Sequence, residues 1–247
     1  MRELTGGDAK ESDLVFLGLL GMIDPPRKQA KKAVQTCHRA GVKTVMITGD
    51  HRATAAAVAR ELDIIRPGEW TVTGGELDFM PQEVLEEDIE KFAVFARVTP
   101  EHKMRIVKAW QKRGHVVAMT GDGVNDAPAL KTADIGCAMG VAGTDVAKGA
   151  AHMILTDDNF STIVSAIEEG RGIYSNIRKA IHYLLSCNIG EIFTIFAATL
   201  LDFGQMPLVP VQLLWLNLVT DSLPALALGV EPVEEGVMEE KPRDAAA

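Results

Sequence analysis

Positive charge is scarce in this chain, and the shortage bears on the kind of partner that the protein binds. The 25 Lys and Arg residues are outnumbered by 34 Asp and Glu residues, which gives a formal net charge of −9 at pH 7. Binding to nucleic acid requires clustered Lys and Arg to neutralise phosphates, so we expect no nucleic-acid partner. The N-terminus, Met-Arg-Glu-Leu-Thr-Gly-Gly-Asp, is polar and is not expected to be a signal peptide.

Cysteine is also rare, and several common site motifs are missing. The cysteines at positions 37, 137 and 187 form no Cys-x-x-Cys pair, which argues against a disulfide framework or a cysteine-based zinc site and fits a reducing compartment. The glycine-containing run that ends at Lys148 lacks the Gly-Lys-Ser/Thr ending of a P-loop. The Asp-Phe-Gly at 202–204 has no other kinase signature beside it, so we predict a short turn there.

Two regions of different composition share the 247 residues. Short apolar runs alternate with helical patterns up to about residue 155, and the chain becomes far more apolar after about residue 180. The alternation predicts a parallel sheet covered by helices on both faces. The predicted strands are 14–23, 42–48, 116–119, 133–139 and 152–155, and the predicted helices are 28–39 and 52–62. Residues 69–91 are predicted to form an acidic, irregular surface segment with a short helix around 84–92.

The run Thr-Gly-Asp-Gly-Val-Asn-Asp-Ala-Pro-Ala-Leu at 120–130 follows one of these strands and predicts a ligand site. Its glycines allow the backbone to turn sharply and to approach a ligand closely. Asp122 and Asp126, with Asn125 between them, then lie at the carboxyl end of a strand, where ligands bind in open α/β sheets. Such hard oxygen ligands suit Mg²⁺, which usually takes one or two carboxylates together with phosphate oxygens.

Two other stretches predict contacts to a phosphate group. Thr-Gly-Asp at 48–50 lies between a strand and a helix, which is the arrangement of an anion-binding nest. Thr99 is expected to cap a further helix that starts at Pro100, and this puts Lys103 in the first turn, near the carboxyl ends of the strands. Taken alone, either stretch is more often an ordinary loop or a solvated helix face.

Together these motifs resemble those of the P-type cation-transporting ATPases, which belong to the haloacid-dehalogenase-like group of phosphotransferases. The run at 120–130 is similar to their hinge-and-magnesium motif, and Phe-Ala-Arg-Val-Thr-Pro-Glu-His-Lys at 95–103 is similar to the motif that puts a lysine on the transferring phosphate. The resemblance implies a haloacid-dehalogenase-like, Rossmann-type α/β fold, with ATP as substrate and Mg²⁺ as cofactor. The implied roles are Thr48, Gly49 and Lys103 on the phosphoryl group, Asp122 on Mg²⁺, Asp126 behind that ligand, and Arg97, Asn125 and Asp126 on the nucleotide side.

Residues 160–201 predict one long, proline-free helix that is N-capped by Asp158 or Asn159. Its first part, 161–180, is polar and predicts a stalk outside the membrane. Its second part, 181–201, is long enough to cross a bilayer at about 1.5 Å of rise per residue. The stalk is therefore expected to continue directly into a membrane span.

A second apolar span at 208–230 completes a predicted transmembrane hairpin, so we expect a multi-pass protein of the lipid bilayer. Arg178 and Lys179 precede the first span. By the tendency of positive residues to stay inside, they predict that the α/β domain lies on the cytoplasmic side.

Oxygen-bearing polar residues interrupt these apolar spans, namely Asn188, Glu191, Asn217, Thr220 and Asp221. Helical spacing puts the first two on one face and the other three on another. A carboxylate near the bilayer centre costs about 2.5–3.5 kcal/mol, so the two carboxylates need a compensating partner. An all-oxygen set favours a hard cation such as Ca²⁺, and Pro224 leaves the carbonyl of Thr220 free because it has no N–H. The alternative is that these groups only hydrogen-bond the two helices together.

The same spans resemble the fifth and sixth membrane helices of calcium pumps of the sarcoplasmic-reticulum type, through Asn-Ile-Gly-Glu and Asn-Leu-Val-Thr-Asp-Ser-Leu-Pro. The resemblance implies that Ca²⁺ is the transported ion. It puts Asn188, Glu191, Thr220 and Asp221 in one calcium site, and Asn217 and again Asp221 in the other. Ile-Asp-Pro-Pro-Arg-Lys at 23–28 is similar to the linker at which the nucleotide-binding domain of these pumps rejoins the phosphorylation domain.

The resemblance covers essentially the whole chain, but the chain covers only part of the family pattern. No Asp-Lys-Thr-Gly occurs in it, so the aspartate that attacks ATP is absent. We therefore expect a fragment that needs the remainder of the pump as its partner and forms no aspartyl phosphate alone; a phosphoaspartate detected on this polypeptide by mass spectrometry would refute this. The expected parts are the end of the nucleotide-binding domain (1–13), the phosphorylation domain without its nucleophile strand (14–160), the stalk (161–180), two spans (181–201 and 208–230) and a cytoplasmic loop (231–247).

For the complete protein we expect ATP hydrolysis at the Mg²⁺ site to drive cation transport, coupled mechanically through the long helix. Two other classes stay open at this point. A membrane-anchored phosphatase of the dehalogenase type predicts a nucleophilic Asp-x-Asp upstream and no ion affinity in the hairpin. A non-catalytic membrane protein that uses the sheet domain for interactions predicts that Asp122→Asn and Lys103→Ala change nothing.

Overall fold

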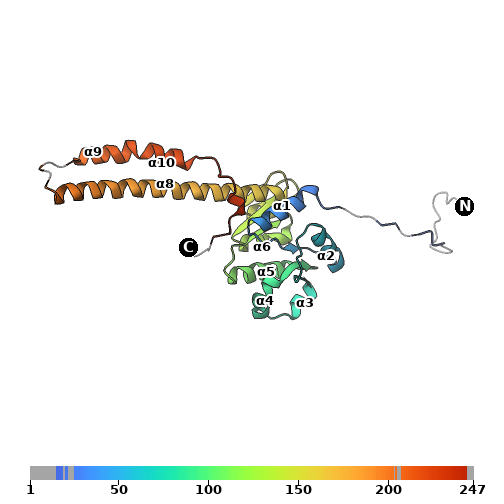
Figure 1. Cartoon of the computed structure of the whole chain (residues 1–247). Helices are drawn as coiled ribbons and strands as arrows, with labels where there is room; N and C mark the ends of the chain where they lie inside the picture. The colour runs from blue at the N-terminus through green and yellow to red at the C-terminus, as the bar shows by residue number, and fades with distance from the viewer. Residues whose placement is uncertain (1–14, 19, 22–24, 203, 205–206, 244–247) are drawn as a thin grey trace.

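The computed structural model describes residues 15–18, 20–21, 25–202, 204 and 207–243. An α/β domain carries one long helix, and a second helical segment runs back beside that helix toward the domain (Figure 1). Pro242, next to the last described residue, then lies close to Gly41 of the domain. The chain is thus an α/β domain joined to a projecting helical hairpin.

The described strands form two parallel sheets of three strands each, in the orders β1-β3-β2 and β4-β5-β6. The strands are β1 (Met46–Ile47), β2 (Trp70–Thr73), β3 (Phe92–Ala96), β4 (Ala118–Gly121), β5 (Ile135–Met139) and β6 (Met153–Leu155). Met46 lies opposite Val94 in the first sheet, and Met119 lies opposite Gly136 in the second. The prediction of parallel strands is confirmed, with the strands divided between two sheets.

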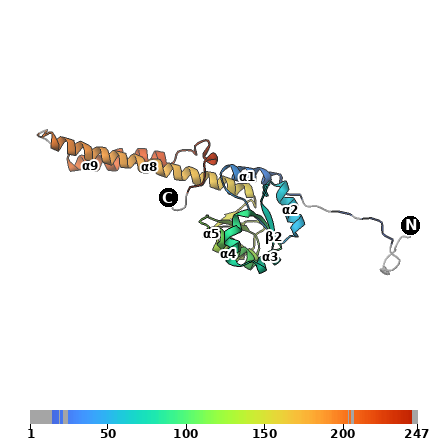
Figure 2. The same cartoon turned by 60° about the horizontal axis from the view of Figure 1, so that its bottom comes forward.

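Helices cover both faces of the first sheet, as predicted. The helices of the domain are α1 (Lys28–Arg39), α2 (Arg52–Glu61), α3 (Gly74–Phe79), α4 (Gln82–Asp88), α5 (Pro100–Lys112), α6 (Ala127–Thr132) and α7 (Asp145–Ala150). On one face, Ala55 and Ala59 of α2 pack against Val94. On the other, Leu77 and Ile106 pack around Phe95. Figure 2 shows α1 and α2 on one side of the domain and α3, α4 and α5 on the other.

The prediction of an irregular segment at 69–91 is wrong, because this stretch contains β2, α3 and α4. A capping box starts α3: the hydroxyl of Thr73 accepts from the N–H of Glu76 (3.3 Å), and the carboxylate of Glu76 accepts from the N–H of Thr73 (2.7 Å). The helix predicted around 84–92 ends earlier, in a 3-10 turn at Ile89–Lys91, because buried Phe92 begins the central strand β3.

The strand predicted at 14–23 is not formed in its described part. Val15, Phe16 and Leu17 have no regular structure and are exposed, Leu17 to 96%. A strand needs a neighbour for its backbone N–H and C=O groups, and none of the described strands pairs with this segment. Residues 14, 19 and 22–23 of the prediction lie outside the described part of the chain.

The bounds of two predicted helices hold closely, whereas those of two predicted strands change. The helix at 28–39 is α1, and the one at 52–62 is α2, which ends at Glu61. The strand at 42–48 shortens to β1, and the strand at 116–119 moves two residues along the chain to β4.

The predicted long helix is α8 (Phe160–Leu200), which is capped by the side chain of Asn159. Its first turns are part of the domain core. Ile163 packs against Cys137 and Leu155 on the free face of the second sheet, and Val164 packs against α1. Beyond these turns α8 leaves the domain as a single continuous helix.

The second span consists of α9 (Pro210–Trp215), a π-helical segment (Leu216–Thr220) and α10 (Ser222–Gly229). It lies beside α8, and both helical segments are long and apolar enough to cross a membrane. Large apolar side chains on both are exposed, among them Phe193, Phe196 and Leu223. An exposed apolar surface of this extent suits contact with lipid.

The residues that follow α10 return to the base of α8. Arg171 of α8 donates to the carbonyl oxygens of Val237 (2.9 Å) and Glu240 (2.9 Å) and to that of Ala40 (2.6 Å) at the end of α1. Lys179 forms an ion pair with Glu231 at 2.8 Å. One arginine thus holds the returning segment, α8 and α1 together.

Candidate functional site

The predicted magnesium motif folds into a tight turn after β4, with Asp126 at its centre. The ammonium of Lys103 forms an ion pair with Oδ1 of Asp126, and the two side chains are only 16% and 9% exposed. Oδ2 of Asp126 accepts from the N–H groups of Asp122 (3.3 Å) and Gly123 (3.2 Å). Asp126 therefore links α5 to the turn and fixes the main chain of Asp122.

Helix α5 starts where the sequence predicted, and this start positions Lys103. The hydroxyl of Thr99 accepts from the N–H of His102 at 3.4 Å, and Pro100 is the first helical residue. His102 is buried, accepts from the N–H of Thr99 through Nδ1 (3.2 Å) and contacts Asp78 through Nε2 (2.7 Å). The first turn of α5 is therefore held on both sides, and Lys103 points to Asp126.

The second phosphate motif joins the first through the main chain. Thr48 donates its N–H to Phe95 (2.9 Å), and its carbonyl accepts from the N–H of Val98 (3.3 Å). The N–H of Arg97 donates to the carbonyl of Asp50 at 3.1 Å. The turns after β1 and β3 are therefore hydrogen-bonded to each other at the carboxyl edge of the first sheet.

Two details of these turns are typical of a ligand site: open space beside the backbone and an uncommon backbone angle. A side chain added at Gly49 would meet no atom within 4 Å, so the backbone there faces open space. Arg97 has a φ of 51°, an uncommon value for a residue with a side chain, and its side chain is exposed. Strained backbone of this kind concentrates at functional sites.

The residues present fit a Mg²⁺ ion only as one part of its coordination shell. Among the described residues no group of three or more His, Cys, Asp and Glu side chains could hold a metal ion. The side chains of Asp122 and Asn125 are exposed, whereas Asp126 is already paired with Lys103. The exposed carboxylate of Asp122 at a strand end suits Mg²⁺, which takes its other ligands from water and phosphate oxygens.

In the hairpin, three of the five polar residues of the spans lie on its inner side. Nδ2 of Asn217 donates to the carboxylate of Glu191 at 3.0 Å, which joins the second span to α8. Asp221 is buried, with 7% of its surface exposed. Asn188 and Thr220 are exposed instead, and Asn188 donates to Leu184 of its own helix at 2.8 Å. The described hairpin therefore brings together only part of the predicted ion site.

The π-helical segment was not predicted from the sequence. The N–H of Asp221 donates to the carbonyl of Leu216 at 2.9 Å, five residues earlier, and the hydroxyl of Ser222 donates to the carbonyl of Asn217 at 3.0 Å. Short π segments of this kind are frequent at functional sites. Pro224, which cannot donate to Thr220, was the sequence signal that regular helical bonding fails here.

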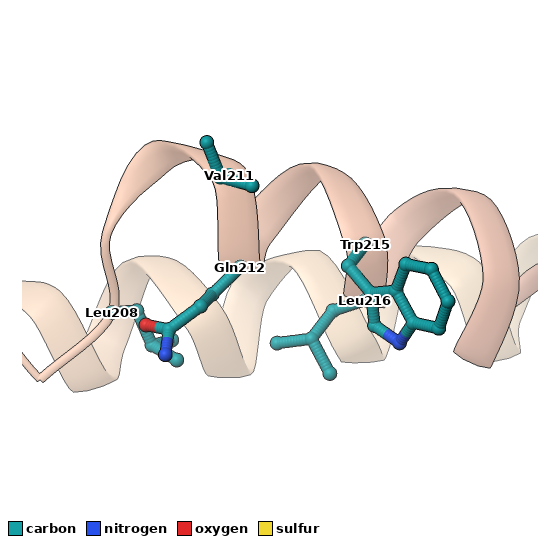
Figure 3. A pocket seen from close by; sticks show the side chains of 5 residues that line it. All are labelled: Leu208, Val211, Gln212, Trp215 and Leu216. Carbon is teal, nitrogen blue, oxygen red and sulfur yellow. The ribbon is translucent and has the colours of Figure 1, made fainter.

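A hollow of about 440 Å³ lies along α9, at the end of the hairpin far from the α/β domain (Figure 3). Leu208, Val211, Gln212, Trp215 and Leu216 line it, and none of the predicted ion ligands is among them. Gln212 accepts from the N–H of Val209 at 3.0 Å, so its one polar side chain is already engaged. The hollow is an apolar surface and is separate from the ion site.

Two residues near the magnesium motif were missed as site residues. The N–H of Thr144 donates to the carbonyl of Asp122 at 2.8 Å. Asp158, predicted only as a possible helix cap, accepts through its carboxylate from the N–H groups of Val141 (2.9 Å) and Ala142 (2.7 Å). These bonds hold the pKa of Asp158 below its usual value.

Family models match most of the chain. A model described as haloacid dehalogenase-like hydrolase matches residues 3–134, and another with the same description matches residues 103–167. A model described as cation transporting ATPase, C-terminus, matches residues 205–247. The matches follow the division into an α/β domain and a helical hairpin.

Curated relatives extend over nearly the whole chain. Calcium-transporting ATPase 1 of Bacillus cereus is 58% identical over 238 residues, which are 96% of this chain and 27% of that protein. Calcium-transporting ATPase type 2C member 1 of Homo sapiens is 52% identical over 94% of this chain and 25% of its own length. The chain therefore spans about a quarter of the length of the relatives that it matches.

The fold of the chain is also similar to that of solved structures. The crystal structure of a zinc-transporting PIB-type ATPase matches with a TM-score of 0.56 and 30% identity. The match covers 82% of this chain and 27% of that one. The resemblance inferred from the sequence motifs is confirmed by these comparisons.

Proposed function

The chain belongs to the haloacid dehalogenase-like hydrolase family, and we propose that the protein containing it is an ATP-driven, P-type transporter of Ca²⁺. The observation that carries the proposal is the course of α8. This helix begins in the core of the α/β domain, beside the second sheet, and continues unbroken to Glu191 in the hairpin. One continuous helix thus connects the proposed phosphate site with the proposed ion site.

In the proposed reaction, ATP phosphorylates an aspartate supplied by a part of the protein outside this chain. The carboxylate attacks the γ-phosphorus, the bond to the ADP oxygen breaks, and water later hydrolyses the aspartyl phosphate to release phosphate. Lys103 offsets the charge that develops on the phosphoryl oxygens, and the hydroxyl of Thr48 and the backbone N–H of Gly49 donate to them. A bound Mg²⁺ would neutralise phosphate charge as a Lewis acid, and Asp122 is the carboxylate that this chain contributes to it.

The two sheets suggest where the phosphorylated aspartate enters. β1 and β4 are both edge strands, and no ladder joins them in the described structure. Ile47 of β1 and Val117 beside β4 pack against the same two hydrophobic clusters. We propose that a strand from the remainder of the protein fits between them, making one parallel sheet whose carboxyl edge holds the aspartate beside Thr48 and Asp122.

For the ion site, we propose that Glu191, Asn217 and Asp221 coordinate Ca²⁺ from the inner side of the hairpin. The carboxylates give the charge, and the π-helical turn presents backbone oxygens as further ligands. Asn188 and Thr220 complete the shell in the whole protein, where helices outside this chain cover their exposed faces. Arg178 and Lys179 orient the hairpin so that the α/β domain and its ATP lie in the cytoplasm.

The test is ATP-driven calcium uptake by the full-length protein in sealed vesicles, with Asp122→Asn as the variant. We expect uptake and a calcium-dependent phosphoaspartate in the wild type, and loss of both in the variant. ATP-independent phosphatase activity without uptake would identify the membrane-anchored phosphatase instead. Equal behaviour of wild type and variant in every assay would identify a non-catalytic module.

A further inference from the structure

The loop between β5 and α7, residues 140–144, connects the magnesium motif to the beginning of α8. At its far end the N–H of Thr144 donates to the carbonyl of Asp122 at 2.8 Å. The hydroxyl of Thr144 caps α7 by accepting from the N–H of Ala147 at 3.3 Å. The main chain of Asp122 is therefore held from one side by Asp126 and from the other by this loop.

The loop is tightly folded against the second sheet. A Cβ added at Gly140 would come within 2.7 Å of the carbonyl oxygen of Leu155, and one at Gly143 would clash with the carbonyl of Met139. Backbone atoms cannot move aside as a flexible side chain does. The loop consequently has little freedom to shift unless the residues next to it shift as well.

Asp158 holds this loop from the side of α8. Its carboxylate accepts from two successive N–H groups of the loop, those of Val141 (2.9 Å) and Ala142 (2.7 Å). Its backbone has a φ of 50°, and its carbonyl accepts from Arg27 at 2.8 Å. The next residue, Asn159, caps α8 by accepting from the N–H of Ser161 at 3.0 Å.

Hydrogen bonds, linked by short stretches of main chain at 142–144 and 158–159, thus connect the turn at Asp122 through the loop to the first turn of the long helix. We propose that Asp158 is a positioning residue that ties the magnesium-binding turn to the start of α8. Through this tie, a change in the turn on phosphorylation is transmitted to α8, and the position of α8 in turn sets the position of Asp122. The inference rests on the proposed function and adds to it the residue through which the two sites communicate.

The neighbouring Asp157 provides a matched control. Its carboxylate accepts from the N–H of Asn159 (3.2 Å) and from the hydroxyl of Thr162 (2.6 Å), so it supports the same helix start. None of its described hydrogen bonds reaches the loop. Asp157→Asn and Asp158→Asn remove the same charge one residue apart, and asparagine tolerates the left-handed backbone of position 158.

The experiment compares these two variants in the full-length protein. Asp158→Asn is expected to raise the Mg²⁺ concentration needed for half-maximal phosphoenzyme by about threefold to tenfold, less than the loss typical of a direct partner of a metal ligand. It is also expected to lower the amount of calcium moved per ATP hydrolysed. Asp157→Asn is expected to leave both quantities at their wild-type values.

Amide hydrogen exchange gives a readout that needs no turnover. In Asp158→Asn the N–H groups of Val141 and Ala142 should exchange faster, whereas Asp157→Asn should affect only the first turn of α8. Equal Mg²⁺ dependence and coupling ratio in the two variants would overturn the inference while the proposed function stands. A wild-type protein that forms no phosphoenzyme would overturn the proposed function, and the inference with it.

Discussion

The α/β domain and the helical hairpin differ in how closely their own residues pack together. In the domain, a Cβ added at Gly121 or Gly136 would collide with neighbouring atoms, and the carboxylate of Asp126 is bonded on both oxygens. In the hairpin, a Cβ added at Gly190 or Gly229 would meet nothing, and large apolar side chains are exposed. The domain is largely packed by its own residues, whereas the hairpin needs lipid or other helices around it.

The two regions also differ in how many of the contacts within its proposed functional site each region makes by itself. The phosphate motifs are bonded to one another, and their proposed completion is a single strand between β1 and β4. Among the described residues, the proposed ion site has one side-chain hydrogen bond between the spans, from Asn217 to Glu191, and Asp221 is buried. The difference implies that substitutions in the domain act mainly through contacts within the domain, and that those in the hairpin act through the proposed surroundings of lipid and further helices.

The largest effect is expected at Lys103. Lys103→Ala removes the ammonium that we propose offsets charge on the transferring phosphoryl group, and it takes the ion-pair partner away from the buried carboxylate of Asp126. Loss of one such charge-stabilising group costs about 10²–10³ in rate. The measurement is the rate of phosphoenzyme formation from ATP in the full-length protein. Lys108→Ala, an exposed lysine on the same helix, is the control, and an equal fall in both variants would contradict the assigned role.

A smaller effect is expected from adding one methyl group in each region. At Gly136 in β5, the new Cβ clashes with the carbonyl oxygen of Leu130, so Gly136→Ala should destabilise the domain by about 1–3 kcal/mol. At Gly170 of α8 the space is open, so Gly170→Ala should stabilise the helix by about 0.5–1 kcal/mol. Denaturant unfolding of the two purified variants tests the contrast. Comparable destabilisation by both would show that the exposed side of α8 is also closely packed.

The smallest effect is expected on acidification, at residues 140–144 and 157–158, where the α/β domain meets the start of α8. The Val141 and Ala142 amides lower the pKa of Asp158, and the Thr162 hydroxyl lowers that of Asp157. A lowered pKa contributes stability that is present above the unfolded value of about 3.9 and is lost as the pH falls through the folded value. Hydrogen-exchange protection of residues 140–144 should therefore decline below about pH 4. In Asp158→Asn that protection should be low already at neutral pH; a decline of the same size in this variant would assign the acid effect to another group.

Local sequence signals predicted the parts of the domain that depend on local structure. Thr99 and Pro100 fixed the start of α5 and hence the place of Lys103, and the glycines of the 120–130 run marked the turn at Asp122. The capping box of Thr73 and Glu76 is also present in the sequence as a local signal. It lies in an acidic stretch that was predicted to be irregular, so α3 was not predicted. The strand at 14–23 failed for a non-local reason, since its apolar pattern could not show whether a neighbouring strand is available.

The sequence patterns did not predict contacts between segments that are far apart along the chain. The carboxylate of Asp158 bonds to amides 16 and 17 residues away, and no periodicity in the sequence records that distance. The direct pairing of Lys103 with Asp126 was not predicted either, because Lys103 was assigned to the phosphoryl group and Asp126 to the magnesium and nucleotide side. In the hairpin, helical spacing grouped Asn188 with Glu191, but the rotation of α8 leaves Asn188 exposed.

The calcium dependence of phosphoenzyme formation tests the central claim most directly, because it asks whether the hairpin controls the chemistry in the α/β domain. In the full-length protein, Glu191→Gln or Asp221→Asn should raise the calcium concentration required for phosphorylation by ATP by about tenfold to a thousandfold, since each removes one ligand charge. The Mg²⁺ requirement should stay unchanged, and Asp202→Asn, at the exposed turn between the spans, should behave as the wild type. An unaltered calcium requirement in both Glu191→Gln and Asp221→Asn would contradict the account.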